Sequence, residues 1–93
     1  MRELRFDEFA GCVGETYELV QDGQRLPLTL ETAQELPPSV REAGCFRLAW
    51  RGPFEPLLPQ AIYRLERGGE IYDIFIVPIG RDQSGTQYEA VFN

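Results

Sequence analysis

The chain has 93 residues, with nine basic residues, all of them arginine, against fifteen acidic residues, so its formal net charge is −6. This length supports one hydrophobic core, and we expect a single domain over residues 1–93. The absence of histidine excludes imidazole zinc sites and histidine-activated nucleophiles, and the absence of lysine excludes Schiff bases and P-loops. The acidic balance argues against nucleic acid and anionic membranes as partners.

Two cysteines, Cys12 and Cys45, are too few for a disulfide scaffold and lack the spacing of a metal site. We expect buried, reduced thiols, although a single bridge between them is compatible with the sequence. Residues 1–9 are too charged for a signal peptide, and no apolar run reaches the roughly 18–20 residues of a membrane span. The sequence therefore predicts a cytoplasmic protein, or one exported without a cleaved signal, with no cofactor and no metal.

The first expected element is a single helical turn. Phe6 and Phe9 are three residues apart, so one turn places both aromatic rings on the same side. Asp7 and Glu8 suit the first turn of a helix, and Gly11 ends it. We expect this turn to cover one end of the core.

A β-hairpin is expected next. Residues 16–20 alternate between polar and apolar, Asp22-Gly23 is typical of a hairpin turn, and residues 25–32 alternate again. Pro27 lacks an amide donor, which places it on an edge strand or on an outward-facing strand edge. Residues 31–44 then allow two interpretations. Either the strand continues to Leu36, or Ser39 caps a helical turn that Gly44 ends.

Residues 45–51 form the clearest strand of the sequence, with large apolar side chains on one face and arginines on the other. Residues 52–60 contain three prolines, which exclude a helix or a central strand. This segment is expected to be a stiff, partly extended loop.

The C-terminal half predicts three further strands. Residues 61–66 are followed by the Gly68-Gly69 turn, and residues 71–79 are apolar on both faces except at Asp73. Such a pattern is typical of a central strand that is covered on both sides. A polar loop over 81–85 and a last strand over residues 86–92 complete the domain. The sequence thus predicts an all-β fold, a small antiparallel barrel or sandwich of six strands with a short N-terminal helical turn.

Three segments carry a resemblance to a known family. They are LPQAIYRLE (residues 58–66), FIVPIG (residues 75–80) and YEAVFN (residues 88–93). They resemble a family of short uncharacterised bacterial proteins, a domain of unknown function, that shares LPQG-x-Y-x-LEHP, VPVG and a closing YEAVFN. Ala61 replaces the usual glycine, and Arg67-Gly68 replaces His-Pro. The resemblance implies an association with phage-tail-like or tail-collar-type surface proteins, and hence an assembly accessory.

Residues 52–60, called the proline loop below, are the best candidate for a partner-binding surface. Exposed apolar side chains on a stiff loop lose little entropy on binding, although the loop also has the composition of a plug for an open barrel end. Arginines on the flanking strands would bind an acidic segment, or would instead pair with Glu18, Glu66 or Glu89. The predicted partner-binding residues are Trp50, Phe54, Leu57, Leu58, Arg47, Arg51 and Arg64.

Two other classes of site remain open. Glu66, Glu70, Asp73 and Glu89 are candidates for a carboxylate-based enzyme or a cation site, if two of them meet. Tyr63, Tyr72 and Tyr88 are candidate polar groups inside a small-ligand-binding β-barrel. The C-terminal strand either closes this protein's own sheet or extends a partner's. We favour a non-enzymatic protein-interaction or assembly module with a protein partner, and the oligomeric state is left open.

Overall fold

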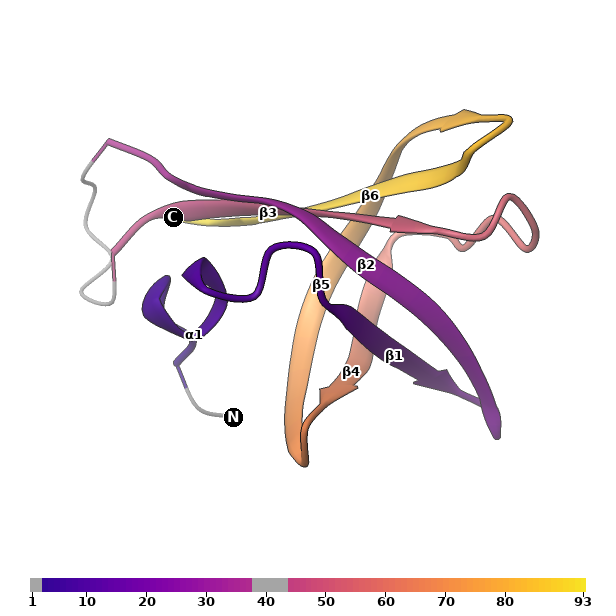
Figure 1. Ribbon diagram of the computed structural model, residues 1–93, viewed down its shortest axis with the longest axis horizontal. Helices are drawn as coiled ribbons and strands as arrows, with labels where there is room; N and C mark the ends of the chain where they lie inside the picture. Colours follow the sequence, from indigo (N-terminus) through magenta and orange to yellow (C-terminus); the bar gives the residue numbers. More distant parts are fainter. Residues whose placement is uncertain (1–2, 38–43) are drawn as a thin grey trace.

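The computed structural model describes residues 3–37 and 44–93, and these form one short helix and six strands (Figure 1). The helix α1 spans Asp7–Ala10. The strands are β1 (Thr16–Gln21), β2 (Gln24–Glu35), β3 (Phe46–Gly52), β4 (Ala61–Arg67), β5 (Glu70–Asp82) and β6 (Gly85–Phe92). The expected all-β class with an N-terminal helical turn is confirmed.

The six strands form a closed barrel rather than a sandwich, in the order β1-β2-β3-β6-β5-β4. All neighbouring strands are antiparallel, and β1 closes the barrel on β4. The last strand, β6, lies between β3 and β5, so the C-terminal segment closes the protein's own sheet. The order also places β3 and β4 on opposite sides of the barrel, and the proline loop connects them (Figure 1).

The first hairpin is formed as its sequence predicts, because Asp22 and Gly23 adopt positive φ angles of 50° and 78° at the turn. Of the two positions expected for Pro27, the edge strand is wrong, since a closed barrel has no edge strand, and the position at a locally unpaired strand edge agrees with the register. Pro27 pairs with Glu18 of β1, and the register between β2 and β3 begins only at Thr29. Its missing amide donor is therefore accommodated where β2 has just one neighbour.

Two connections differ in extent from the expectation. The strand interpretation is confirmed in its main part, because β2 continues past residue 31, but it ends at Glu35, one residue before the expected Leu36. The alternative helical turn capped by Ser39 falls on residues outside the described part of the chain. The polar loop expected over 81–85 is shorter, since β5 continues to Asp82 and β6 begins at Gly85. The Asp82 carboxylate accepts the Ser84 amide at 2.8 Å, which tightens this turn.

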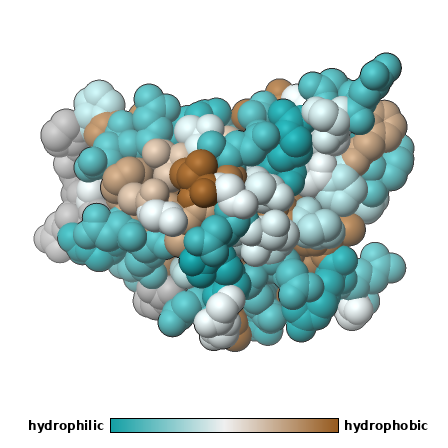
Figure 2. Space-filling view, in the orientation of Figure 1, coloured by the Kyte–Doolittle hydropathy of each residue, from teal (hydrophilic) through white to brown (hydrophobic). Residues whose placement is uncertain are grey.

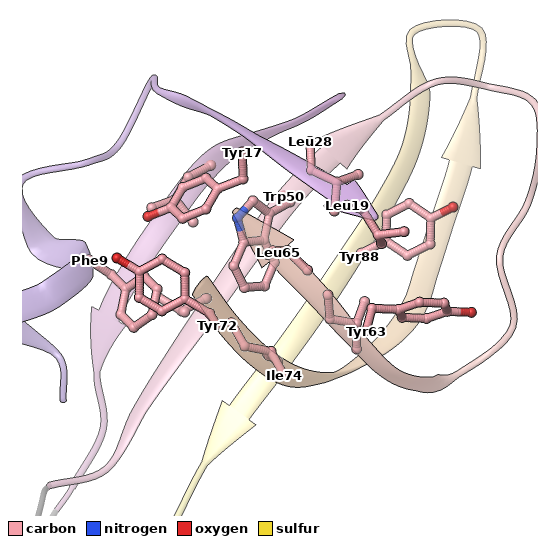
Figure 3. Close-up of a cluster of buried hydrophobic side chains, with 14 of the residues drawn as sticks. Phe9, Tyr17, Leu19, Leu28, Trp50, Tyr63, Leu65, Tyr72, Ile74 and Tyr88 are labelled. Carbon is pink, nitrogen blue, oxygen red and sulfur yellow. The ribbon is translucent and has the colours of Figure 1, made fainter. Parts of the chain in front are cut away.

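Inward-facing side chains of all six strands fill the barrel, and α1 covers one end (Figures 1 and 3). Phe9 of α1 is fully buried and its ring lies 5.2 Å from that of Tyr72 and 6.1 Å from that of Phe46. These contacts confirm that the helical turn covers the core. Burial of one such large side chain contributes about 1.5–3 kcal/mol. The largest fully buried side chains are Trp50, Tyr17, Tyr88, Phe9, Phe46, Leu19, Leu28, Leu30, Leu48, Leu65, Ile74 and Ile76.

The outer face of β5 departs from the expectation for this strand. It has a neighbouring strand on each side, as a central strand does, and its inner residues Ile74 and Ile76 are buried. Its outer side chains are nevertheless exposed at Ile71, Phe75 and Ile79. The prediction of a strand covered on both faces is therefore wrong within a single chain. In Figure 2 the surface over β1 and β2 is mainly hydrophilic, whereas a hydrophobic patch lies over α1 and the α1–β1 connection, where Val13 is 51% exposed.

No helix in the described part of the chain is long and apolar enough to cross a membrane.

Candidate functional site

The proline loop both closes a barrel end and presents apolar side chains. Leu58 is only 7% exposed and belongs to the core, and its amide donates to the Tyr88 hydroxyl at 3.2 Å. The Tyr63 hydroxyl donates to the Pro59 carbonyl at 2.6 Å. The second half of the loop is thus a plug, which was one of the two interpretations of its sequence. Phe54 and Leu57, in contrast, are 47% and 49% exposed.

Arg81 of β5 fastens the first half of the loop. Its Nε and Nη2 donate to the Phe54 carbonyl at 2.9 and 2.7 Å, and its Cζ lies 3.9 Å from the centroid of the Phe54 ring. The same guanidinium pairs with Glu55, and the Thr86 hydroxyl donates to the Phe54 carbonyl at 3.5 Å. Cation–π and charge-assisted contacts of this kind fix a surface ring in one position. Phe54 is therefore held in place while half of its surface faces solvent.

Two of the predicted partner-binding residues lie inside the barrel. Trp50 is fully buried, because it shares the inward face of β3 with Phe46 and Leu48. Its indole ring meets the ring of Tyr17 edge-on, with 6.0 Å between the centroids (Figure 3). Leu58 is buried as part of the plug. The expectation of an exposed surface that includes Trp50 and Leu58 is therefore wrong, and its exposed apolar members are Phe54 and Leu57.

The three predicted arginines do not share a face. Arg47 and Arg51 project outward from β3, whereas Arg64 lies on β4, and β6 and β5 separate the two strands. Arg47 forms an ion pair with Glu89, as the alternative interpretation held. Arg51 contacts Glu31 at 2.9 Å, and its pKa is raised mainly by that hydrogen bond. No basic face for an acidic segment is assembled from these residues.

Asp82 completes the ion pairs around Arg51, at 3.4 Å from its Nη1. Hydrogen bonds from the Ser84 hydroxyl and amide hold the pKa of Asp82 below its ordinary value, and Arg51 adds to that effect. Ser84 also contacts the Nη1 of Arg51 at 2.6 Å. The three residues form an exposed network that stabilises the β5–β6 turn.

The candidate carboxylates are dispersed over the outer surface. Arg25 forms ion pairs with Glu66 at 3.1 Å and with Glu18 at 3.6 Å. Glu89 forms an ion pair with Arg47. In residues 3–37 and 44–93, no group of three or more acidic or cysteine side chains is arranged to hold a metal ion. A shared concave site for two of the predicted carboxylates is not formed by this geometry.

The three interior tyrosines are buried as expected, but two of them act on the loop. Tyr63 and Tyr88 use their hydroxyls to hold residues 58–59. Burial raises the pKa of Tyr63, and Tyr88 raises it further. Tyr72 packs against the rings of both Phe9 and Tyr17, which also contact each other (Figure 3). Tyr63 and Tyr88 therefore stabilise the plug instead of pointing free hydroxyls at a ligand.

One comparison with known proteins gives a match. The profile of a family described as "Domain of unknown function (DUF6916)" matches residues 4–92. The chain belongs to this family. No curated protein and no solved structure gives a significant match. Membership in the DUF6916 family confirms the predicted relation to an uncharacterised domain and assigns no activity.

The DUF6916 chain also carries a polar cluster at the α1 end that sequence reasoning missed. Arg67 donates to the Cys12 sulfur at 3.1 Å, pairs with Glu15 at 3.3 Å, and lies over the ring of Tyr17. Neither Cys12 nor Cys45 forms a disulfide, so the possible bridge is not made. Arg67 replaces the histidine of the resembled motif, and here it links β4 to the segment between α1 and β1.

Tyr17 is the most buried titratable group of this cluster. Burial raises the pKa of its hydroxyl well above the ordinary value, and the neighbouring Cys12 and Tyr72 raise it further, whereas Arg67 opposes them. The hydroxyl forms no hydrogen bond to any described residue. Its neutral form is therefore favoured in the folded protein.

Replacement of Tyr17 by phenylalanine is expected to flatten the alkaline loss of stability. Below about pH 10 the Tyr17 hydroxyl is neutral in both the folded and the unfolded chain, so it makes the free energy of unfolding of the wild type no lower. Because the folded-state pKa is raised, only the unfolded chain ionises as the pH rises further, and the free energy of unfolding of the wild type falls. At pH 7, Tyr17→Phe should stay within about 1 kcal/mol of the wild type, since no hydrogen bond is lost. Urea unfolding at pH 7 and above pH 10 measures both effects. Equal losses in the two proteins would contradict the expectation.

Proposed function

We propose that this protein is a non-enzymatic protein-interaction module that contacts its partner through Phe54 and Leu57 of the proline loop. The observation that supports the proposal is that two large apolar side chains are half exposed on a loop whose backbone is fastened on both sides of them. A soluble domain gains nothing for its own stability from holding such side chains toward water.

The fastening explains why this loop is suited to binding. Binding loses conformational entropy for each interface side chain and loop residue that becomes ordered, which costs about 0.5–1.5 kcal/mol of binding free energy per flexible side chain. Arg81 already immobilises the Phe54 ring, and Tyr63 and Tyr88 already hold the segment that follows Leu57. The binding energy of the two apolar groups is therefore retained in the affinity. A partner with a small apolar pocket fits them best.

The arrangement of polar groups supports recognition over catalysis. Acid–base chemistry needs carboxyl groups whose environment is concave and whose pKa values are driven apart. Glu66 and Glu89 instead lie on the outer surface of the barrel, each neutralised by an arginine. A small-ligand barrel would use the interior tyrosines, and two of these hold the loop.

The biological setting stays a prediction from the sequence resemblance. An accessory of a phage-tail-like or tail-collar-type surface assembly would use a small, rigid domain of this kind to hold one partner. A cytoplasmic location before assembly is compatible with that role, and it is likewise a prediction.

Substitution of both exposed loop residues tests the proposal. Wild type, Phe54→Ser/Leu57→Ser and Val13→Ser are immobilised, and proteins captured from native host extract are quantified by mass spectrometry. Val13 is a matched control, because it is equally exposed on the α1–β1 connection. We expect at least one protein that wild type and the Val13 variant retain equally and the loop variant loses at least about tenfold. Identical capture by all three would refute the loop as contact surface. A thermal melt of each variant checks that the fold is intact.

A further inference from the structure

The outer face of the β4–β5 hairpin carries two register pairs that match in character, whereas the next pair, Glu66 opposite Ile71, does not match. Ile62 of β4 lies opposite Phe75 of β5, and both are more than half exposed, at 61% and 52%. Two residues further along β4, and therefore on the same face, Arg64 lies opposite Asp73, and both are exposed. An apolar pair therefore stands beside a pair of opposite charges on the same face (Figure 1 shows β4 and β5 side by side).

Arg64 is an exception among the arginines of the barrel. Within the described strands, it alone has no carboxylate within 4.0 Å, although Asp73 is its register neighbour. The other strand arginines, each with a carboxylate partner, are Arg25, Arg47, Arg51, Arg67 and Arg81. Asp73 likewise forms no ion pair in the part of the chain that the structure describes. The face thus holds one positive and one negative group that the chain itself does not bring together.

A two-fold axis between two copies of the chain would bring the guanidinium of Arg64 in one copy against the carboxylate of Asp73 in the other. In face-to-face packing, consider an axis that runs parallel to the strands, midway between β4 and β5, in the plane between the two sheets. Rotation about this axis places β4 of one copy over β5 of the other at the same height along the strands. Each residue then faces its own register neighbour from the second copy. Ile62 faces Phe75 and Arg64 faces Asp73, and each contact occurs twice, as in any isologous interface.

We propose that the outer face of β4 and β5 binds a second copy of this chain, with reciprocal Arg64–Asp73 and Ile62–Phe75 contacts about such an axis. This interface goes beyond the loop-mediated function, because it uses different residues. A second copy fits better than an unrelated partner, because the patch carries both signs of charge in complementary register. It also supplies the missing cover for β5, whose sequence is apolar on both faces like that of a strand buried on both sides.

Charge reversal at the two positions tests the interface by sedimentation velocity on the full chain. In an Arg64→Asp homodimer, two carboxylates face each other, and in an Asp73→Arg homodimer two guanidinium groups do. Like charges in contact across an interface weaken binding strongly, so each variant should raise the dimer Kd by at least about 100-fold. An equimolar mixture of the two variants restores opposite charges at both contacts, and a heterodimer should form. Arg5→Asp, which makes the same charge change on an exposed residue outside the face, should dimerise like the wild type.

The mixture separates an interface from a folding defect, because a heterodimer forms only from two folded chains. The proposal requires a wild-type dimer, two variants that are monomeric alone, and a dimer in their mixture. A wild type that stays monomeric up to about 1 mM would overturn it. So would variants that still dimerise, or a mixture that remains monomeric. If a monomeric wild type instead needs Ile62 and Phe75 to bind a different protein, the face belongs to that partner and the second copy is excluded.

Discussion

Deletion of Tyr88–Asn93 is expected to abolish cooperative folding. The deleted residues include most of β6, which pairs with β3 on one side and β5 on the other, so the barrel would open and leave two unpaired edges. Tyr88 and Ala90 also leave the core, and the ring of Phe92 leaves its stack on Phe46 at 4.4 Å between centroids. Loss of one buried aromatic side chain alone costs about 3–5 kcal/mol.

That loss compares with a total stability of about 5–15 kcal/mol for a typical domain, before any strand pairing is counted. The plug would fail as well, because the Leu58 amide donates to the deleted Tyr88 hydroxyl. Circular dichroism through a thermal melt is the measurement. The control is deletion of Asn93 alone, an exposed residue beyond the end of β6, which should leave the melt unchanged. A cooperative melt for the longer deletion would show that β6 is dispensable.

The strands and their inward faces could be predicted from local pattern because each rests on neighbouring residues. Alternation placed Phe46, Leu48 and Trp50 on one face of β3, and all three are buried. The Asp22-Gly23 pair predicted its own turn, since those residue types tolerate positive φ. Burial of Trp50 followed from this alternation, and placing it on the contact surface conflicted with the pattern of its own strand.

The order of the strands could not be predicted in the same way. Which strand lies beside β3 depends on where a loop crosses the barrel, and no period in the sequence encodes that path. The arginine face failed for this reason, because it required β3 and β4 to be adjacent. The Arg67–Cys12 contact was missed because it joins residues 55 positions apart. Such contacts appear only once the barrel has closed.

Prediction from the sequence was also limited in the irregular proline loop and on the outer face of β5. In the proline loop, Leu57 is exposed and Leu58 is buried, although the two are neighbours of the same type. Without a helical or strand period, composition cannot distinguish them. The pattern of β5, by contrast, correctly showed two apolar faces, and the single chain covers only the inner one. In the proposed dimer the same pattern describes the assembled protein.

Replacement of Gly85 by alanine is expected to destabilise the fold by about 2–5 kcal/mol, from backbone strain and overpacking together. Gly85 begins β6 with φ at +129°, a conformation that residues with a Cβ rarely adopt. A Cβ at this position would overlap the carbonyl oxygen of Gly52 on β3. Neither strand can withdraw easily, because β3 pairs with β6 continuously from Gly52 opposite Thr86 to Phe46 opposite Phe92. Equilibrium urea unfolding gives the difference in free energy.

Two other glycines make the result interpretable. Gly52→Ala would bring a Cβ within 2.6 Å of a side-chain atom of Leu28, and that side chain can move, so we expect a smaller loss than at Gly85. Gly11→Ala has φ of −91° and no atom within 4 Å, and should be neutral or stabilise slightly. The expected order of stability is therefore Gly11→Ala, then Gly52→Ala, then Gly85→Ala. If Gly85→Ala unfolds at the same urea concentration as Gly11→Ala, the close approach of β3 and β6 at this end of the barrel is wrong.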